Sequence, residues 1–156
     1  MGILNYTTEV PAIKSAGEIQ GILAMKGAHS IGIDYQQGEP VGLMFRLMIK
    51  DNDVAFRLPS NWEGVFRVMQ NDKKIQPRYK TKEQAKRVSW RILKDWVEAQ
   101  MAIIESGQTK TEEVFLPYAM TSTGQTLFQK IQEDPVRLLG GGPELRLLSS
   151  GERERA

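Results

Sequence analysis

An alternating pattern over residues 41–50 constrains the fold more than any other feature of this sequence. One face of the extended chain carries Val41, Leu43, Phe45, Leu47 and Ile49. The other face carries Gly42, Met44, Arg46, Met48 and Lys50. Because successive side chains of a strand point to opposite sides, the pattern predicts a strand with one face in the core. For the Met44 and Met48 face we favour cover by helices; the alternative is an adaptable protein-binding surface.

Shorter alternating runs flank this strand on both sides. They consist of Ile31, Ile33 and Tyr35 before it, and Val54, Phe56 and Leu58 after it. Turn-forming residues separate the runs, at Gln37 and Gly38 and again at residues 51–53. Two short turns between three alternating runs predict an antiparallel meander of three strands.

Helix-start signals surround the predicted meander. Ser or Thr followed three residues later by Glu or Gln indicates a capping box, and this pattern occurs at Ser15, Ser60 and Thr81. The Thr81 signal opens the longest predicted helix, residues 82–105, which Gly107 closes. Shorter helices are expected from Thr111 and over residues 125–132.

These elements predict an α+β fold in the order α-β-β-β-α-α, with a small antiparallel three-stranded meander packed against helices. We expect one domain over residues 1–134 and a flexible tail over residues 135–156, which contains three consecutive glycines at 140–142. Residues 1–14 are interpreted as an extended arm. Such an arm can pair with the sheet edge of a second copy, so a homo-oligomer is a possible outcome.

Helical periodicity assigns one stripe of the long helix to the core. The residues of this stripe are Ala85, Val88, Ile92, Trp96, Ala99 and Ile103. The opposite half of the helix carries most of its lysines and arginines, and Trp90 lies among them.

Positive charge is concentrated in residues 73–94. This segment holds nine of the 21 lysines and arginines and a single acid, Glu83, which gives a formal +8. Cations neutralise phosphates, and exposed aromatic rings stack on bases. The candidate nucleic-acid-binding residues are Lys73, Lys74, Arg78, Tyr79, Lys80, Lys82, Lys86, Arg87, Trp90, Arg91 and Lys94. A solvated helix face and a surface for an acidic protein remain alternative interpretations.

Few residues are available for catalysis. The sequence has no cysteine and one histidine, His29, which excludes disulfides, thiolate chemistry and cysteine-bound zinc. Asp51 and Asp53 are the nearest approach to a metal site, but a hairpin turn also explains them and is favoured. We expect no enzyme, no metal and no cofactor.

No apolar run reaches the ~20 residues of a membrane span, and a bacterial host cytoplasm is the expected location.

The order of the elements resembles the double-stranded RNA-binding domain. Lys82, Ala85 and Lys86 match the spacing of the lysine-rich motif that opens the last helix of that family, with Glu83 where a second lysine is usual. The resemblance implies phosphate contacts from this helix.

Over its whole length the sequence also resembles small uncharacterised proteins of phage and mobile elements. The resemblance lies in the opening eight residues, in residues 79–81 and in residues 95–100. Proteins of that kind commonly bind nucleic acid or disable a host defence complex. The leading expectation is therefore a non-catalytic accessory protein that binds DNA or RNA through the basic helix and loop. The rival is an anti-defence inhibitor, similar in role to anti-CRISPR proteins, that binds a host nucleoprotein complex.

Overall fold

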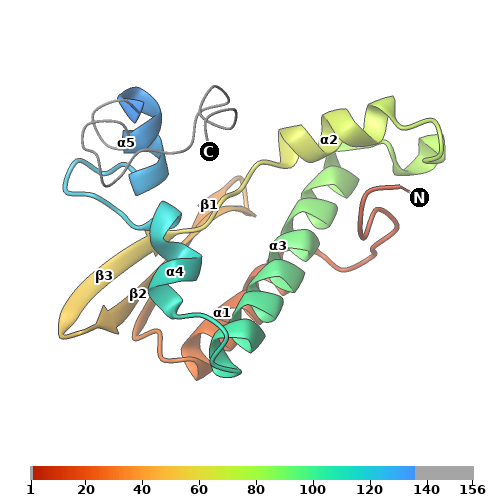
Figure 1. Cartoon of the computed structure of the whole chain (residues 1–156). Helices are drawn as coiled ribbons and strands as arrows, with labels where there is room; N and C mark the ends of the chain where they lie inside the picture. The colour runs from red at the N-terminus through yellow and green to blue at the C-terminus, as the bar shows by residue number, and fades with distance from the viewer. Residues whose placement is uncertain (1, 136–156) are drawn as a thin grey trace, which may run out of the picture.

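The computed structural model describes residues 2–135 (Figure 1). The elements in chain order are α1 (Ala12–Met25), β1 (Ser30–Gln36), β2 (Glu39–Ile49), β3 (Asn52–Arg57), α2 (Trp62–Asn71), η1 (Pro77–Tyr79), α3 (Lys82–Glu105), α4 (Thr111–Phe115), η2 (Leu116–Tyr118) and α5 (Leu127–Glu133). The expected α+β class and element order are confirmed. Apart from Pro135, the segment predicted as a flexible tail lies outside the described residues.

The strands form an antiparallel sheet in the order β1-β2-β3. Leu43, Phe45 and Leu47 are buried on one face, as the alternation predicts. The prediction for Val41 is wrong, because its side chain is 39% exposed. The register between β1 and β2 shifts near the start of β2, opposite Asp34, which turns Pro40 rather than Val41 toward the interior.

The turn between β2 and β3 consists of Lys50 and Asp51. Both residues have positive φ, 47° and 65°. Two left-handed residues in a two-residue loop match the twist of the flanking strands, so this is an ordinary hairpin connection. It begins one residue earlier than the predicted turn at residues 51–53.

The main core lies between the sheet and the helices α1, α3 and α4. Phe45 stacks on Phe56 with ring centroids 5.2 Å apart, and Phe115 of α4 meets Phe45 edge-on at 5.5 Å. These helices all pack on the Leu43 side of β2. The expectation that helices cover the opposite face is wrong for Met48, which is 58% exposed.

Helix α3 has the predicted ends. The Thr81 side chain accepts a hydrogen bond from the Gln84 backbone N–H at 3.1 Å, and Gly107 follows the helix with φ of 78°. The predicted single core stripe is wrong in its C-terminal part, because Ala99 and Ile103 are exposed. The reason is that α3 is buried against two different neighbours. The residues buried in the main core are Trp90, Leu93, Val97 and Met101, and those buried against α2 are Ala85 and Val88.

The second, smaller core lies at the other end of α3. It consists of the buried residues Met69, Ile75, Ala85 and Val88, with Tyr6 and other half-buried residues packed around them. Figure 1 shows α2 and the N-terminus beside this end of α3, away from the sheet. We call these four buried residues the second cluster.

The N-terminal segment completes the second cluster and is not a strand. The Gln84 side-chain amide donates hydrogen bonds to the carbonyl oxygens of Tyr6 and Thr8, at 2.9 and 2.8 Å. The expected extended arm is therefore wrong, because residues 4–7 form turns and the backbone is held against α3.

Two of the predicted helix starts are also displaced. Helix α1 begins at Ala12, after Pro11 at the N-cap, and Ser15 is buried inside the helix. Pro11 has a backbone φ of −58°, close to the helical value, and no side chain caps the start of this helix. Helix α2 is capped by Asn61 rather than Ser60.

Candidate nucleic-acid interface

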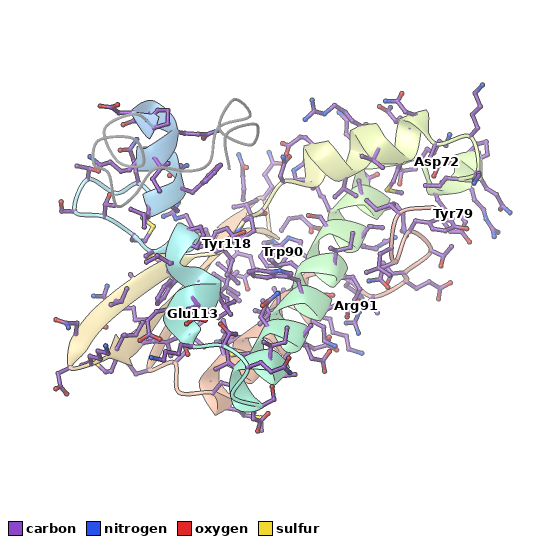
Figure 2. All side chains as sticks on the ribbon, viewed as in Figure 1. Asp72, Tyr79, Trp90, Arg91, Glu113 and Tyr118 are labelled. Carbon is purple, nitrogen blue, oxygen red and sulfur yellow. The ribbon has the colours of Figure 1, made fainter. Side chains whose placement is uncertain are left out.

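Seven of the predicted cations lie together at the end of the molecule that carries the second cluster. We call this set the basic end; its members are Lys73, Lys74, Arg78, Lys80, Lys82, Lys86 and Arg87. Within residues 2–135 none of the seven forms an ion pair. Figure 2 shows Asp72 and Tyr79 here, among nitrogen-tipped side chains that point outward.

The connection between α2 and α3 positions the first four cations. Ile75, which is 2% exposed, anchors this connection in the second cluster, while Lys73 and Lys74 on its N-terminal side are exposed. Asp72 accepts the backbone N–H of Lys74 at 2.8 Å. The Lys80 ammonium donates to the Gln70 carbonyl at 3.1 Å, near the C-terminus of α2, where the helix dipole favours a cation.

The first two turns of α3 position the other three cations of the basic end. Lys82 and Arg87 are exposed, and Arg87 donates to the Gln84 side-chain oxygen at 3.2 Å. The Lys86 ammonium lies 5.3 Å from the centre of the Trp62 ring, which is a cation–π contact, and Lys86 and Arg87 line a pocket together with Glu39 and Glu83. Glu83 is the one carboxylate on these two turns.

Arg91 and Lys94, which were also predicted to bind nucleic acid, lie outside the basic end and are paired within the protein. Arg91 pairs with Glu18 of α1, and its side chain is only 21% exposed. Lys94 pairs with Glu98 at one turn's distance and lies 3.7 Å from Asp95. The protein's own carboxylates neutralise both cations, so the continuous basic stripe expected along α3 ends at Arg87.

The predicted base-stacking aromatics are also engaged within the protein. Trp90 is 3% exposed, and its indole N–H donates to the Pro40 carbonyl oxygen at 3.0 Å. The prediction that it contacts nucleic acid is therefore wrong. Tyr79 is half-buried, with Tyr6 against it edge-on at 5.7 Å and the Arg78 guanidinium 4.7 Å from its ring centre.

Sequence reasoning missed Arg67, an exposed cation on α2. It lies in a shallow depression with Gly64, Val68, Asn71 and Asp72. Arg67 falls outside the charge-rich segment, so a count of charges along the chain does not find it. The helical spacing of the apolar residues of α2 places Arg67 on the outer face of this helix, so the sequence pattern could have identified it.

The single histidine lies beside an ion pair on the outer face of the sheet. His29 Nε2 lies 2.9 Å from Asp53, and the Arg46 guanidinium contacts the other oxygen of the same carboxylate at 2.9 Å. The hydrogen bond from Arg46, followed by that from His29, lowers the pKa of Asp53 below its ordinary value. Over the described part of the chain, no three histidine, aspartate or glutamate side chains gather as a metal-binding group.

Comparisons with protein families, with curated proteins and with solved structures find no match to this chain. None of the helices within residues 2–135 combines the length and apolar character needed to cross a bilayer.

Proposed function

We propose that this chain is a non-catalytic nucleic-acid-binding protein that holds the phosphate backbone of DNA or RNA at its basic end. One observation carries the proposal: seven cations gather at one end of the molecule without an ion pair in the described residues. The resemblance of the sequence to small phage and mobile-element proteins supports an accessory role in such an element.

The geometry favours phosphate contacts over recognition of bases. Trp90 is buried and Tyr79 is packed between Tyr6 and Arg78, so neither offers the open aromatic surface on which bases stack. Lysine and arginine contacts to phosphate position a protein without reading sequence. Binding is therefore expected to be strongly salt-dependent and weakly dependent on sequence.

The test is fluorescence anisotropy with labelled duplexes and single strands of DNA and RNA between 50 and 200 mM salt, concentrations on the order of those in which counterion release is measured. With at most seven phosphate contacts, the slope of log affinity against log salt for duplex DNA should be no steeper than about −6. Absence of binding to every probe at the lowest salt would refute the proposal.

A charge-matched pair of variants locates the surface. Lys73→Glu with Lys82→Glu reverses two cations of the basic end, and affinity should fall by about tenfold or more. Lys50→Glu with Arg57→Glu makes the same change in net charge at exposed positions outside the basic end, and affinity should change by less than about threefold. Equal losses in the two variants would mean that net charge, rather than this surface, drives binding.

A further inference from the structure

An apolar groove lies between α2, α3 and η2, where the two cores meet. Its volume is about 270 Å³. The residues that matter for its chemistry are Val65, Ile92, Trp96 and Tyr118, with the polar groups of Asn61 and Ser89 also in the lining. Small-molecule sites usually begin near about 300 Å³, so the groove has room for one bulky side chain rather than for a cofactor.

The aromatic wall of the groove is held by the main core. Trp96 meets Tyr118 edge-on at 5.7 Å and Phe115 edge-on at 5.8 Å. The opposite wall is Val65 of α2, which packs against the second cluster. Both walls are thus fixed by packing behind them, which lowers the entropy cost of ordering the site on binding.

One stripe of α3 connects this groove to the basic end. Lys82, Lys86, Ser89, Leu93 and Trp96 follow one another at intervals of four, three, four and three residues, a spacing that places them along one side of a helix. Along this stripe the surface changes from cationic to apolar within four turns. The Lys86 ammonium, beside the Trp62 ring, lies at the boundary.

Charge complementarity and desolvation together select the occupant. A partner that follows the stripe must present anions to Lys82 and Lys86 and a large apolar group to the groove. A nucleotide base fits the second requirement poorly, because its polar edges would lose hydrogen bonds among apolar walls. An aliphatic or aromatic side chain has no such edges, and neighbouring aspartates or glutamates of the same peptide supply the anions.

We infer that the groove binds an acidic peptide segment of a partner protein through one bulky apolar side chain, with the peptide's carboxylates on Lys82 and Lys86. This inference goes beyond the proposed function and does not depend on it. Because Lys82 and Lys86 belong to the basic end, such a peptide and a nucleic acid compete for the chain.

The test is a selection of random twelve-residue peptides displayed on phage against the full chain, followed by anisotropy with the enriched peptides synthesised and labelled. Enriched peptides should carry a bulky apolar residue flanked by acids. Ser89→Phe fills the groove and should lower the affinity for the enriched peptides by about tenfold or more. Ser89→Ala should change that affinity by less than about threefold. Lys86→Glu should also lower the affinity for these peptides by about tenfold.

Three outcomes would overturn the inference. They are failure to enrich any peptide, enriched peptides without acidic residues, and peptide affinities that Ser89→Phe leaves unchanged while circular dichroism shows an intact fold. Adenosine monophosphate is a parallel probe for the remaining alternative, a nucleotide base in the groove. If it binds the unsubstituted chain, Ser89→Phe abolishes that binding, and no peptide binds, the groove is assigned to a base.

The two proposals fail separately. Ser89→Phe should keep its affinity for nucleic acid, while Lys73→Glu with Lys74→Glu should lose nucleic acid and keep the peptides, since both lysines lie on the α2–α3 connection outside the stripe.

Discussion

Replacing Gln84 with methionine tests how the N-terminal segment is held. Gln84 is 6% exposed, and its amide nitrogen donates to the backbone oxygens of Tyr6 and Thr8. Methionine fills a similar volume without donating either hydrogen bond, and it also removes the acceptor of the exposed Arg87 guanidinium, a surface contact of small weight. Each such bond contributes about 1 kcal/mol, and both carbonyls belong to half-buried residues, so we expect a loss of about 2 kcal/mol.

Urea unfolding measures this loss, which should lower the midpoint by about 1 M for a slope of about 2 kcal/mol per molar urea. Gln20→Met, at an exposed position of α1, is the matched control and should shift the midpoint by less than about 0.3 M, since surface changes stay within about 0.5 kcal/mol. Hydrogen exchange over residues 2–10 should accelerate in the Gln84 variant alone. An unchanged midpoint with unchanged exchange would show that the two hydrogen bonds do not hold the segment.

Three further predictions concern other parts of the fold. The hydrogen bond from Arg46 lowers the pKa of Asp53 in the folded state. The ionised Asp53 carboxylate therefore contributes fully to stability above the unfolded-state pKa of about 3.9, and this contribution is lost as the pH falls through the lower folded-state pKa. Asp53→Asn should flatten the acid limb of a profile of unfolding free energy against pH. Trp90→Phe removes the hydrogen bond to Pro40, so thermal unfolding should show a loss of about 1–2 kcal/mol while nucleic-acid affinity stays constant; weaker binding by a stably folded variant would restore Trp90 to the interface. Phe115→Ala opens a cavity in the main core and should lower the free energy of unfolding, measured by chemical denaturation, by about 3–5 kcal/mol. A loss below about 1 kcal/mol would contradict the packing of Phe115 described above.

The sheet and α3 were predictable from the sequence because their signals are local. Alternation identifies β2, and Thr81 and Gly107 mark the ends of α3 without any tertiary contact. The failures at Val41 and Ser15 have a different origin. A register shift in the paired strand and a proline at the N-cap override patterns that are correct in isolation.

The candidate site was only partly predictable because charge along a chain does not show which cations meet partners. Arg91 and Glu18 are 73 residues apart in sequence and form an ion pair in the fold. Trp90 lies among basic residues in sequence, but its ring is directed to the main core, because α3 is buried on two sides. A helix wheel drawn for one buried stripe cannot represent that arrangement.

The division of the interior into two cores has an evolutionary consequence. The basic end and α2 depend on the second cluster, whereas the sheet, α1 and α4 depend on the main core. Substitutions in the second cluster or the basic end thus leave the packing of the main core in place. Under the proposed function, α2 and the connection to α3 are where substitutions can alter affinity for a target while the sheet keeps its structure, so divergence among relatives is expected to be fastest there.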